Sequence, residues 1–134
     1  MKLVYPAIFT PCLEREGYTV VVPDLPGCVS EGDSLANSVE MGIDAASGWI
    51  LGEIEDGKQF PAPTPVKEIV ADDPESFVSL LVLDMDSYAE KYGSQSVRKN
   101  VTIPAYLNTY AEQNNISVSG VLQDGLLSLA QNKR

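Results

Sequence analysis

A short β-rich run near the C-terminus constrains most strongly how this chain of 134 residues can fold. Residues 97–103, VRKNVTI, have the side-chain alternation of a strand, and Pro104 ends the run. Two helical patterns follow at once, so no neighbouring segment can pair with it. Because an unpaired strand leaves backbone N–H and C=O groups without partners, a strand here must pair with one from elsewhere.

The two helical patterns are too small to form a core alone. Pro104 suits a first helical position, because its missing N–H costs nothing there. Asn114 and Asn115 end the first pattern, and Ser117 or Ser119 caps the second. A strand and two helices in so few residues bury too little surface, so we expect two copies to pair their strands antiparallel above four helices. The dimer core should contain Val101, Ile103, Leu107, Val121, Leu122 and Leu126.

The polar side of the 97–103 strand is a candidate DNA-reading surface. If Val101 and Ile103 face the helices, Arg98, Asn100 and Thr102 point outward. A two-stranded ribbon fits the major groove, where arginine suits guanine and asparagine suits adenine. The alternative without a binding function is that these polar residues only keep an edge strand soluble. Phosphate contacts are expected from Lys99 and from the N–H groups that open the second helix, near Ser117 and Ser119.

The rest of the chain indicates an α+β architecture with a small sheet and one long helix. Residues 2–13 are β-rich, and Pro6 and Pro11 favour an edge position or a bulge for them. Residues 14–17, EREG, are typical of a hairpin loop before the strand 18–22. Residues 28–30 could form a short third strand. Residues 76–84, SFVSLLVLD, are apolar on both faces, as expected of an internal strand.

The long helix is predicted over residues 34–57. Its apolar residues recur at spacings of three and four, Asp33 or Ser34 suits its N-cap, and Gly57 suits its end. Its acidic residues, Glu40, Asp44, Glu53 and Glu55, should be solvated. Residues 58–65 read as a proline-rich loop, and residues 85–92 as a turn or short helix.

Charge divides the chain into two parts. Residues 1–90 hold seventeen acidic and four basic residues, a charge of −13, whereas residues 91–134 hold two and five, a charge of +3. An acidic body with a mildly basic end suggests two partners of opposite sign. The alternative is an ordinary acidic domain with an unremarkable tail.

Composition excludes several classes of site. There is no histidine, the commonest general base and metal ligand. Two cysteines, Cys12 and Cys28, are too few for a disulfide framework, so both are expected as free thiols. No segment reads as a signal peptide or a membrane span. The sequence therefore predicts a cytoplasmic protein without a cofactor, a metal ion or a membrane partner.

The residues resemble a known family over nearly the whole chain. The segment YTVVVPDLPGCVSEGDSLANSVEMGIDAASGWI resembles the N-terminal domain of HicB-type antitoxins, and residues 97–130 look like a ribbon-helix-helix DNA-binding domain. The motif FxVxxPDLPGCxxxGDSxxEA is fairly specific. Its matching residues here are Pro23, Asp24, Pro26, Gly27, Cys28, Gly32 and Asp33. The paired acids that usually follow the serine are replaced by Ala36 and Asn37.

This resemblance implies a fold, a partner and a role. The fold would be a truncated RNase H-like domain over residues 1–92, followed by a ribbon-helix-helix domain over residues 93–134. The role would be that of a type II antitoxin that neutralises a small basic HicA-like mRNA endonuclease and autorepresses its operon by binding operator DNA. A homodimer is expected, or a tetramer if the N-terminal sheets also pair.

The toxin-binding surface is expected on the acidic N-terminal part. An RNA-cleaving toxin presents a cationic surface to phosphates, which acidic residues can cover. The candidates are Asp24, Glu31 and Asp33 in the turn-rich region, together with the exposed face of the 34–57 helix. Asp24 and Asp33 also have ordinary roles open to them, as turn and cap residues.

Two other functions compete with the antitoxin role. A nuclease of RNase H type needs several converging carboxylates, for which Asp24, Glu31, Asp33, Asp84 and Asp86 are numerous enough. However, the first strand lacks the central aspartate of such a site, so no catalytic residue is expected. The second alternative is a stand-alone ribbon-helix-helix repressor whose N-terminal domain senses a ligand.

Overall fold

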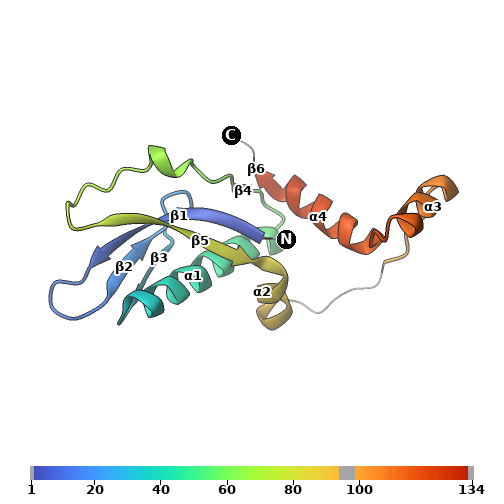
Figure 1. The fold of residues 1–134 in the computed structure, drawn as a ribbon. Coiled ribbons are helices and arrows are strands. Elements are labelled where there is room, and N and C mark those ends of the chain that lie inside the picture. Colours follow the sequence, from blue (N-terminus) through green and yellow to red (C-terminus); the bar gives the residue numbers. More distant parts are fainter. Residues whose placement is uncertain (1, 94–98, 133–134) are drawn as a thin grey trace.

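The computed structural model describes residues 2–93 and 99–132. It shows an antiparallel four-stranded sheet in the order β3-β2-β1-β5, with the long helix α1 across one face (Figure 1). The strands are β1 (Lys2–Pro11), β2 (Tyr18–Val21), β3 (Val29–Gly32) and β5 (Phe77–Asp84). This mixed α+β architecture agrees with the predicted class. Within these residues, no helix combines the length and the apolar character needed to cross a membrane.

Strand β1 lies inside the sheet, so the predicted edge position was wrong. It pairs with β5 from Lys2 to Phe9 but with β2 only from Ile8 to Pro11. At Pro6 the strand therefore has β5 as its one sheet neighbour, and a missing N–H can be tolerated there as on an edge. Pro6 correctly indicated a position with a free side, but this holds for that one residue and not for the whole of β1.

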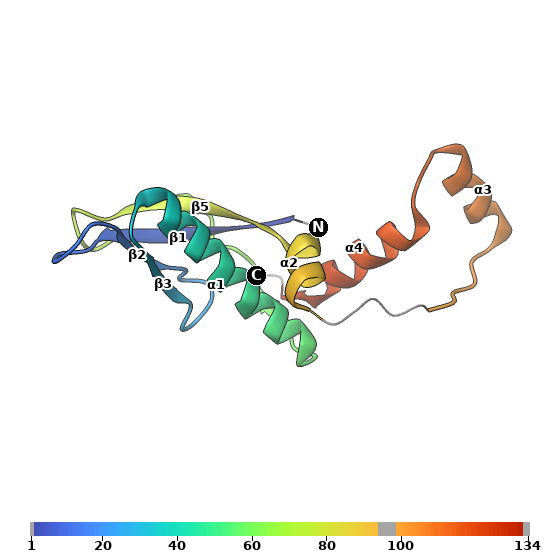
Figure 2. The same cartoon turned by 90° about the horizontal axis from the view of Figure 1, so that it is seen from below.

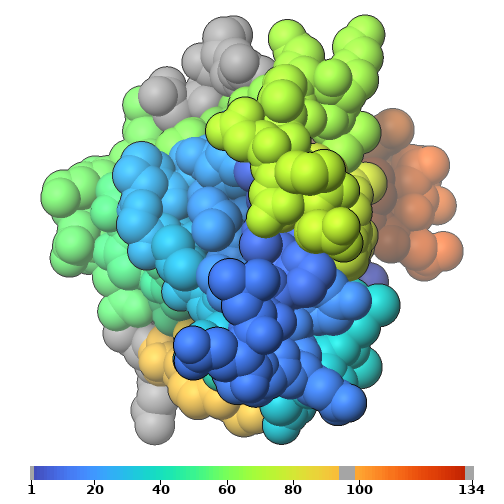
Figure 3. Space-filling model, turned by 90° about the vertical axis from the view of Figure 1, so that its left-hand side faces the viewer, coloured from blue at the N-terminus to red at the C-terminus, as the bar shows by residue number. Residues whose placement is uncertain are grey.

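The hairpin between β1 and β2 and the helix after β3 confirm their predictions. Gly17 closes the hairpin with φ +109°, and the Cys12 N–H donates to its carbonyl at 3.0 Å. Figure 3 views the molecule from this end. Helix α1 (Leu35–Glu55) begins where Ser34 Oγ accepts from the Asn37 N–H at 3.0 Å. It ends before Gly57, which has φ +72°.

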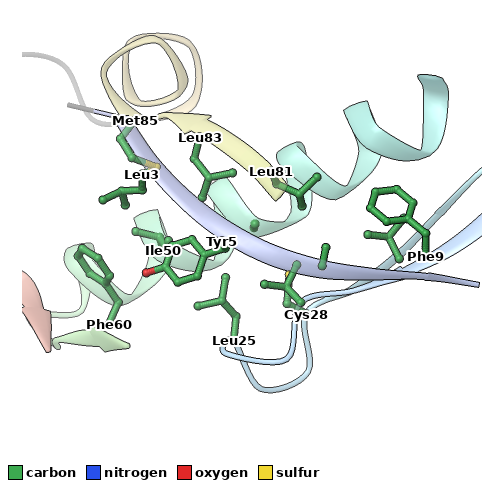
Figure 4. Packing of buried hydrophobic residues seen from close by; sticks show 14 residues of the cluster. Leu3, Tyr5, Phe9, Leu25, Cys28, Ile50, Phe60, Leu81, Leu83 and Met85 are labelled. Carbon is green, nitrogen blue, oxygen red and sulfur yellow. The ribbon is translucent and has the colours of Figure 1, made fainter. Parts of the chain in front are cut away.

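The core lies between α1 and the inner face of the sheet (Figure 4). Alternate residues of β1 and β5 point toward the helix, as the period of a strand requires. Tyr5 and Phe9 of β1, Leu81 of β5 and Ile50 of α1 are completely buried. Phe9 stacks on Phe77 with 5.2 Å between ring centroids. Burial raises the pKa of the Cys28 thiol, and both cysteines are free.

Strand β5 is an edge strand with one covered face, which corrects the prediction of an internal strand. Leu81 and Leu83 are buried under α1, whereas Leu80 and Val82 on the other face are 51% and 50% exposed. Apolar residues on both faces indicate that both faces can be buried, but they do not show what buries the second one. The single chain leaves part of that face uncovered.

The C-terminal helices extend from one end of the sheet (Figures 1 and 2). Helix α2 (Met85–Tyr92) follows β5 directly and confirms the predicted short helix. Helices α3 (Ala105–Gln113) and α4 (Val118–Ala130) match the two predicted patterns. Asn114 and Asn115 end α3, and Asn115 has a left-handed φ of 53°.

Residues 99–104 form neither helix nor strand, although a strand was predicted over residues 97–103. Residues 97 and 98 lie outside the described residues. A strand is defined by its pairing, and the prediction required that the partner belong to another molecule. In a single chain, residues 99–103 therefore lack the inter-strand hydrogen bonds by which a strand is recognised.

Two short strands that the sequence did not predict join the C-terminus to the sheet domain. Strand β4 (Phe60–Pro61), in the predicted loop, pairs in parallel with β6 (Gln131–Asn132). The Tyr5 hydroxyl, which points toward β4 in Figure 4, donates to the Pro61 carbonyl at 2.5 Å. On the inner side of α4, Leu127 and Ala130 pack against the same core. The end of α4 is thus anchored to the N-terminal part. Between β4 and β5 the chain forms the 3-10 turn η1 (Val66–Glu68).

Tyr5→Phe should loosen this anchor. Losing one buried hydroxyl bond should cost about 1 kcal/mol of unfolding free energy at pH 7, measurable by urea denaturation. Burial, the main cause, raises the pKa of Tyr5 to about 12. The folded state therefore keeps a proton that the unfolded state loses near pH 10, so the wild-type stability should fall between about pH 10 and 12. The variant should lack this contribution; identical alkaline profiles would contradict the account.

Candidate functional site

Asp24, a predicted toxin contact, forms hydrogen bonds within the N-terminal domain. Its carboxylate accepts from the Thr64 backbone N–H at 2.9 Å and from the Thr64 hydroxyl at 2.5 Å. These bonds join the turn after β2 to the segment that follows β4. The PDLPG turn is further held by the Trp49 indole, which donates to the Pro26 carbonyl at 3.0 Å. These three bonds give this part of the motif a structural role.

Glu31 and Asp33 lie at the opposite end of the β2–β3 hairpin from Asp24. Glu31 is exposed and pairs with Arg15 at 3.1 Å across the hairpin loop. Asp33 is exposed as well, and its backbone N–H donates to Asn37 Oδ1 at 3.0 Å. Four-residue strands separate the two ends by about 10–13 Å. The structure therefore brings Glu31 and Asp33 together but does not bring Asp24 to them.

The dispersed acids also do not form a metal site. Among residues 2–93 and 99–132, no three Cys, Asp or Glu side chains lie where they could hold an ion. Asp84, a candidate for the nuclease alternative, caps helix α2 by accepting from the Ser87 N–H at 3.2 Å. That bond is the main cause that lowers the pKa of its carboxyl.

A groove that the sequence did not reveal lies between α1, α2 and the end of β5. It has a volume of about 360 Å³. Its lining combines acidic residues with aromatic ones: Glu40, Asp44 and Asp84, with Tyr88, Lys91 and Tyr92. The sequence identified Glu40 and Asp44 as solvated residues of a helix whose exposed face was a candidate toxin surface, but nothing in their spacing places them beside a strand forty residues later.

The described DNA-binding candidates lie in the segment before α3 and at the start of α4. Lys99, Asn100 and Thr102 are exposed, and Arg98 lies outside the described residues. Ser117 is the N-cap of α4, where its hydroxyl accepts from the Gly120 N–H at 3.2 Å. The exposed Ser119 hydroxyl lies 3.3 Å from that of Ser117. The first turn of α4 is therefore open to solvent, as an anion contact requires.

The predicted dimer-core residues are all exposed in the single chain. The side chain of Leu122 in α4 is 43% exposed. The set also contains Val101, Ile103, Leu107, Val121 and Leu126, all exposed. Uncovered apolar residues concentrated on two short helices are typical of a protein interface. Helix α4 thus has one face on the N-terminal core and another without a partner in the described chain.

Comparison with known proteins places nearly the whole chain in one group. Residues 5–125 match the family described as HicB_like antitoxin of bacterial toxin-antitoxin system. A 14.9 kDa protein of Haemophilus phage HP1 is 32% identical over 102 residues, which are 75% of each chain. Antitoxin HicB 1 of Photorhabdus laumondii is 33% identical over 79 residues, 59% of this chain and 50% of that antitoxin.

Solved structures share the fold. The antitoxin HicB of Burkholderia pseudomallei superposes with a TM-score of 0.65 at 24% identity, over 93% of this chain and 96% of that one. The antitoxin HicB3 gives 0.61 at 21% identity, over 97% and 99%. A chain from a toxin–antitoxin complex of Streptococcus pneumoniae gives 0.61 at 23% identity, over 96% and 99%.

Proposed function

The chain belongs to the HicB-like antitoxins of bacterial toxin–antitoxin systems, and we propose that it binds and neutralises a small basic HicA-like mRNA endonuclease. The observation that carries this proposal is the family match over residues 5–125, which covers most of the sheet domain, helix α3 and the first part of α4. In this role the chain is a regulator rather than an enzyme, and it acts in the cytoplasm, where its mRNA-cleaving partner does.

The charge of the N-terminal part supports toxin binding. Residues 1–90 carry a charge of −13, and a protein that cleaves RNA must attract phosphates with cationic side chains. Complementary charge would accelerate the encounter of the two proteins more than it would deepen their affinity. Glu31, Asp33 and the exposed face of α1 are available for this contact, whereas Asp24 contributes by holding the fold.

The direct test in cells is co-expression with the small basic HicA-like protein that the proposal expects to be encoded next to this chain. Expression of that protein alone should arrest growth, and co-expression of the full chain should restore it. Tagged full chain should also co-purify with the toxin. Continued arrest, with the full chain present as a folded protein, would overturn the proposal.

We further propose that residues 93–134 form a ribbon-helix-helix domain, which dimerises and binds operator DNA to repress its own operon. This arrangement is supported by the exposed side chains of Lys99, Asn100 and Thr102, the open first turn of α4 and the uncovered apolar residues of α3 and α4. Pairing of two 97–103 segments would supply the ladder that residues 99–103 lack in the single chain. Arg98, Asn100 and Thr102 would then face the major groove.

Two substitutions separate base reading from phosphate contact. Asn100→Ala should cost about 1–3 kcal/mol on the operator and relax base preference at one position per half-site. Lys99→Ala should weaken binding to every sequence and reduce the salt dependence. Titration of both variants against operator and scrambled DNA, at several salt concentrations, measures the difference. Equal behaviour of the two variants would mean that the ribbon does not read bases.

A further inference from the structure

The outer edge of strand β5, the last strand of the sheet, pairs with no other strand in the described part of the chain. Its first seven residues, FVSLLVL, carry no charge. Such an edge presents unpaired N–H and C=O groups, and proteins usually block it with charges, prolines or a covering segment. Here the 3-10 turn η1 lies near β5, but among the described residues no backbone hydrogen bond is made on the outer side of this largely apolar strand.

Apolar side chains extend this edge onto the face away from α1. Val82 lies opposite Val4 of β1 in the register of the two strands. Both are uncovered, as is Leu80. A segment that paired with β5 would therefore find apolar contacts beside the backbone bonds, as strand addition requires for both affinity and specificity.

The acidic groove between α1 and α2 reaches the same edge. Its lining includes Val82 and Asp84 of β5 as well as Glu40 and Asp44 of α1. Neither Glu40 nor Asp44 forms an ion pair with another described residue. Lys91 also lines the groove and lies 5.2 Å from the centre of the Tyr92 ring. Three carboxylates against one ammonium leave the groove with a charge of −2.

Two side chains that line the groove have shifted pKa values. The Ser87 N–H lowers the pKa of the Asp84 carboxyl, which therefore stays ionised. Burial, and then the charge of Asp44, raises the pKa of the Tyr88 hydroxyl, so this side chain stays neutral. A neutral aromatic ring between carboxylates suits a lysine or arginine side chain, because it can contact both the aliphatic stem and the cation.

We propose that β5 and this groove together receive an extended cationic segment of the toxin. The segment would pair with β5 as a fifth strand of the sheet. Its side chains would alternate between the two faces, so that a lysine or arginine on the α1 side could enter the groove near Glu40 and Asp44. This inference rests on the proposed toxin binding and specifies the surface that performs it.

Charge favours such a segment over a second copy of this chain. Antiparallel self-pairing centred on Leu80 would match apolar residues along the strand. However, each N-terminal part carries a charge of −13, so pairing two copies along β5 would bring two acidic bodies together. A cationic strand meets no such repulsion.

Hydrogen–deuterium exchange of the full chain tests the location. Addition of the purified toxin should slow exchange in the peptide that covers residues 77–84, because outward N–H groups gain partners. Exchange in the hairpin loop, residues 12–17, should not change. Protection of β5 in the absence of toxin, rising with protein concentration, would indicate a second copy and would overturn the proposal.

Matched charge reversals test the groove. Asp44→Lys and Glu14→Lys change the net charge equally, and both residues are exposed, but Glu14 lies in the distant hairpin loop. Asp44→Lys should raise the dissociation constant for the toxin about tenfold or more, the scale of one lost and one repulsive close charge contact. Glu14→Lys should change it less than about threefold. Thermal melting of each variant confirms that both are folded.

The outcomes separate this inference from the proposed function. If the wild-type chain does not bind the toxin, the antitoxin role itself fails. If the wild-type chain binds, while exchange at residues 77–84 is unchanged and the two charge reversals act equally, the antitoxin role stands and the β5 surface is wrong.

Discussion

Leu122→Asp should abolish self-association and operator binding together. Leu122 is 43% exposed in the single chain, and Val121 and Leu126 beside it are also uncovered. In a ribbon-helix-helix dimer this position would be buried between four helices. A carboxylate buried there without a partner would cost several kcal/mol, which a small interface cannot offset.

Sedimentation and DNA titration measure the two losses. The wild-type chain should sediment as a dimer at micromolar concentration, and the variant as a monomer. Toxin binding should survive in the variant, since Leu122 is not part of the buried core. The control is Leu13→Asp, the same change at a fully exposed residue of the hairpin loop. A wild-type monomer, or a variant that still dimerises, would contradict the predicted interface.

Gly32→Ala should strongly destabilise the N-terminal domain. A Cβ at Gly32 would lie 2.4 Å from the Ser38 backbone nitrogen and 2.6 Å from its Cα. These are main-chain atoms of α1, so the strand and the helix would have to separate. We expect a loss of about 3 kcal/mol in the unfolding free energy, at the upper end of overpacking effects. The glycine of the GDS motif is thus required by the close approach of β3 and α1.

The matched control is Gly52→Ala in α1, the helix that Gly32 of β3 approaches. A Cβ at Gly52 would meet no atom within 4 Å, so alanine should stabilise the helix by about 0.5–1 kcal/mol. Urea denaturation of both variants measures the contrast. Equal unfolding free energies would show that the contact at Gly32 does not constrain the fold.

The elements with local signals were predictable from the sequence. Helix α1 follows from the recurrence of apolar residues and from the Ser34 cap, and the structure places its ends where expected. The hairpin at Gly17 follows from turn chemistry alone. Both depend on residues that are neighbours along the chain, and such patterns report local structure reliably.

Features that depend on distant residues were not predictable. The pairing of β4 with β6 involves two residues on each strand, which is too short for any periodicity. Asp24 meets Thr64 forty residues away, and no pattern near Asp24 distinguishes that bond from a surface role. Strand order likewise depends on the whole chain, so β1 was expected at an edge and β5 inside, the reverse of the observed order.

The central claim is that this chain neutralises an mRNA endonuclease, and a titration of RNA cleavage tests it most directly. Purified toxin is mixed with a labelled mRNA, and increasing amounts of the full wild-type chain are added. The account predicts that cleavage falls linearly and ends at a fixed ratio of chain to toxin. The Gly32→Ala variant should protect the mRNA less well at temperatures at which the variant is unfolded. Undiminished cleavage at an excess of folded wild-type chain would contradict the account.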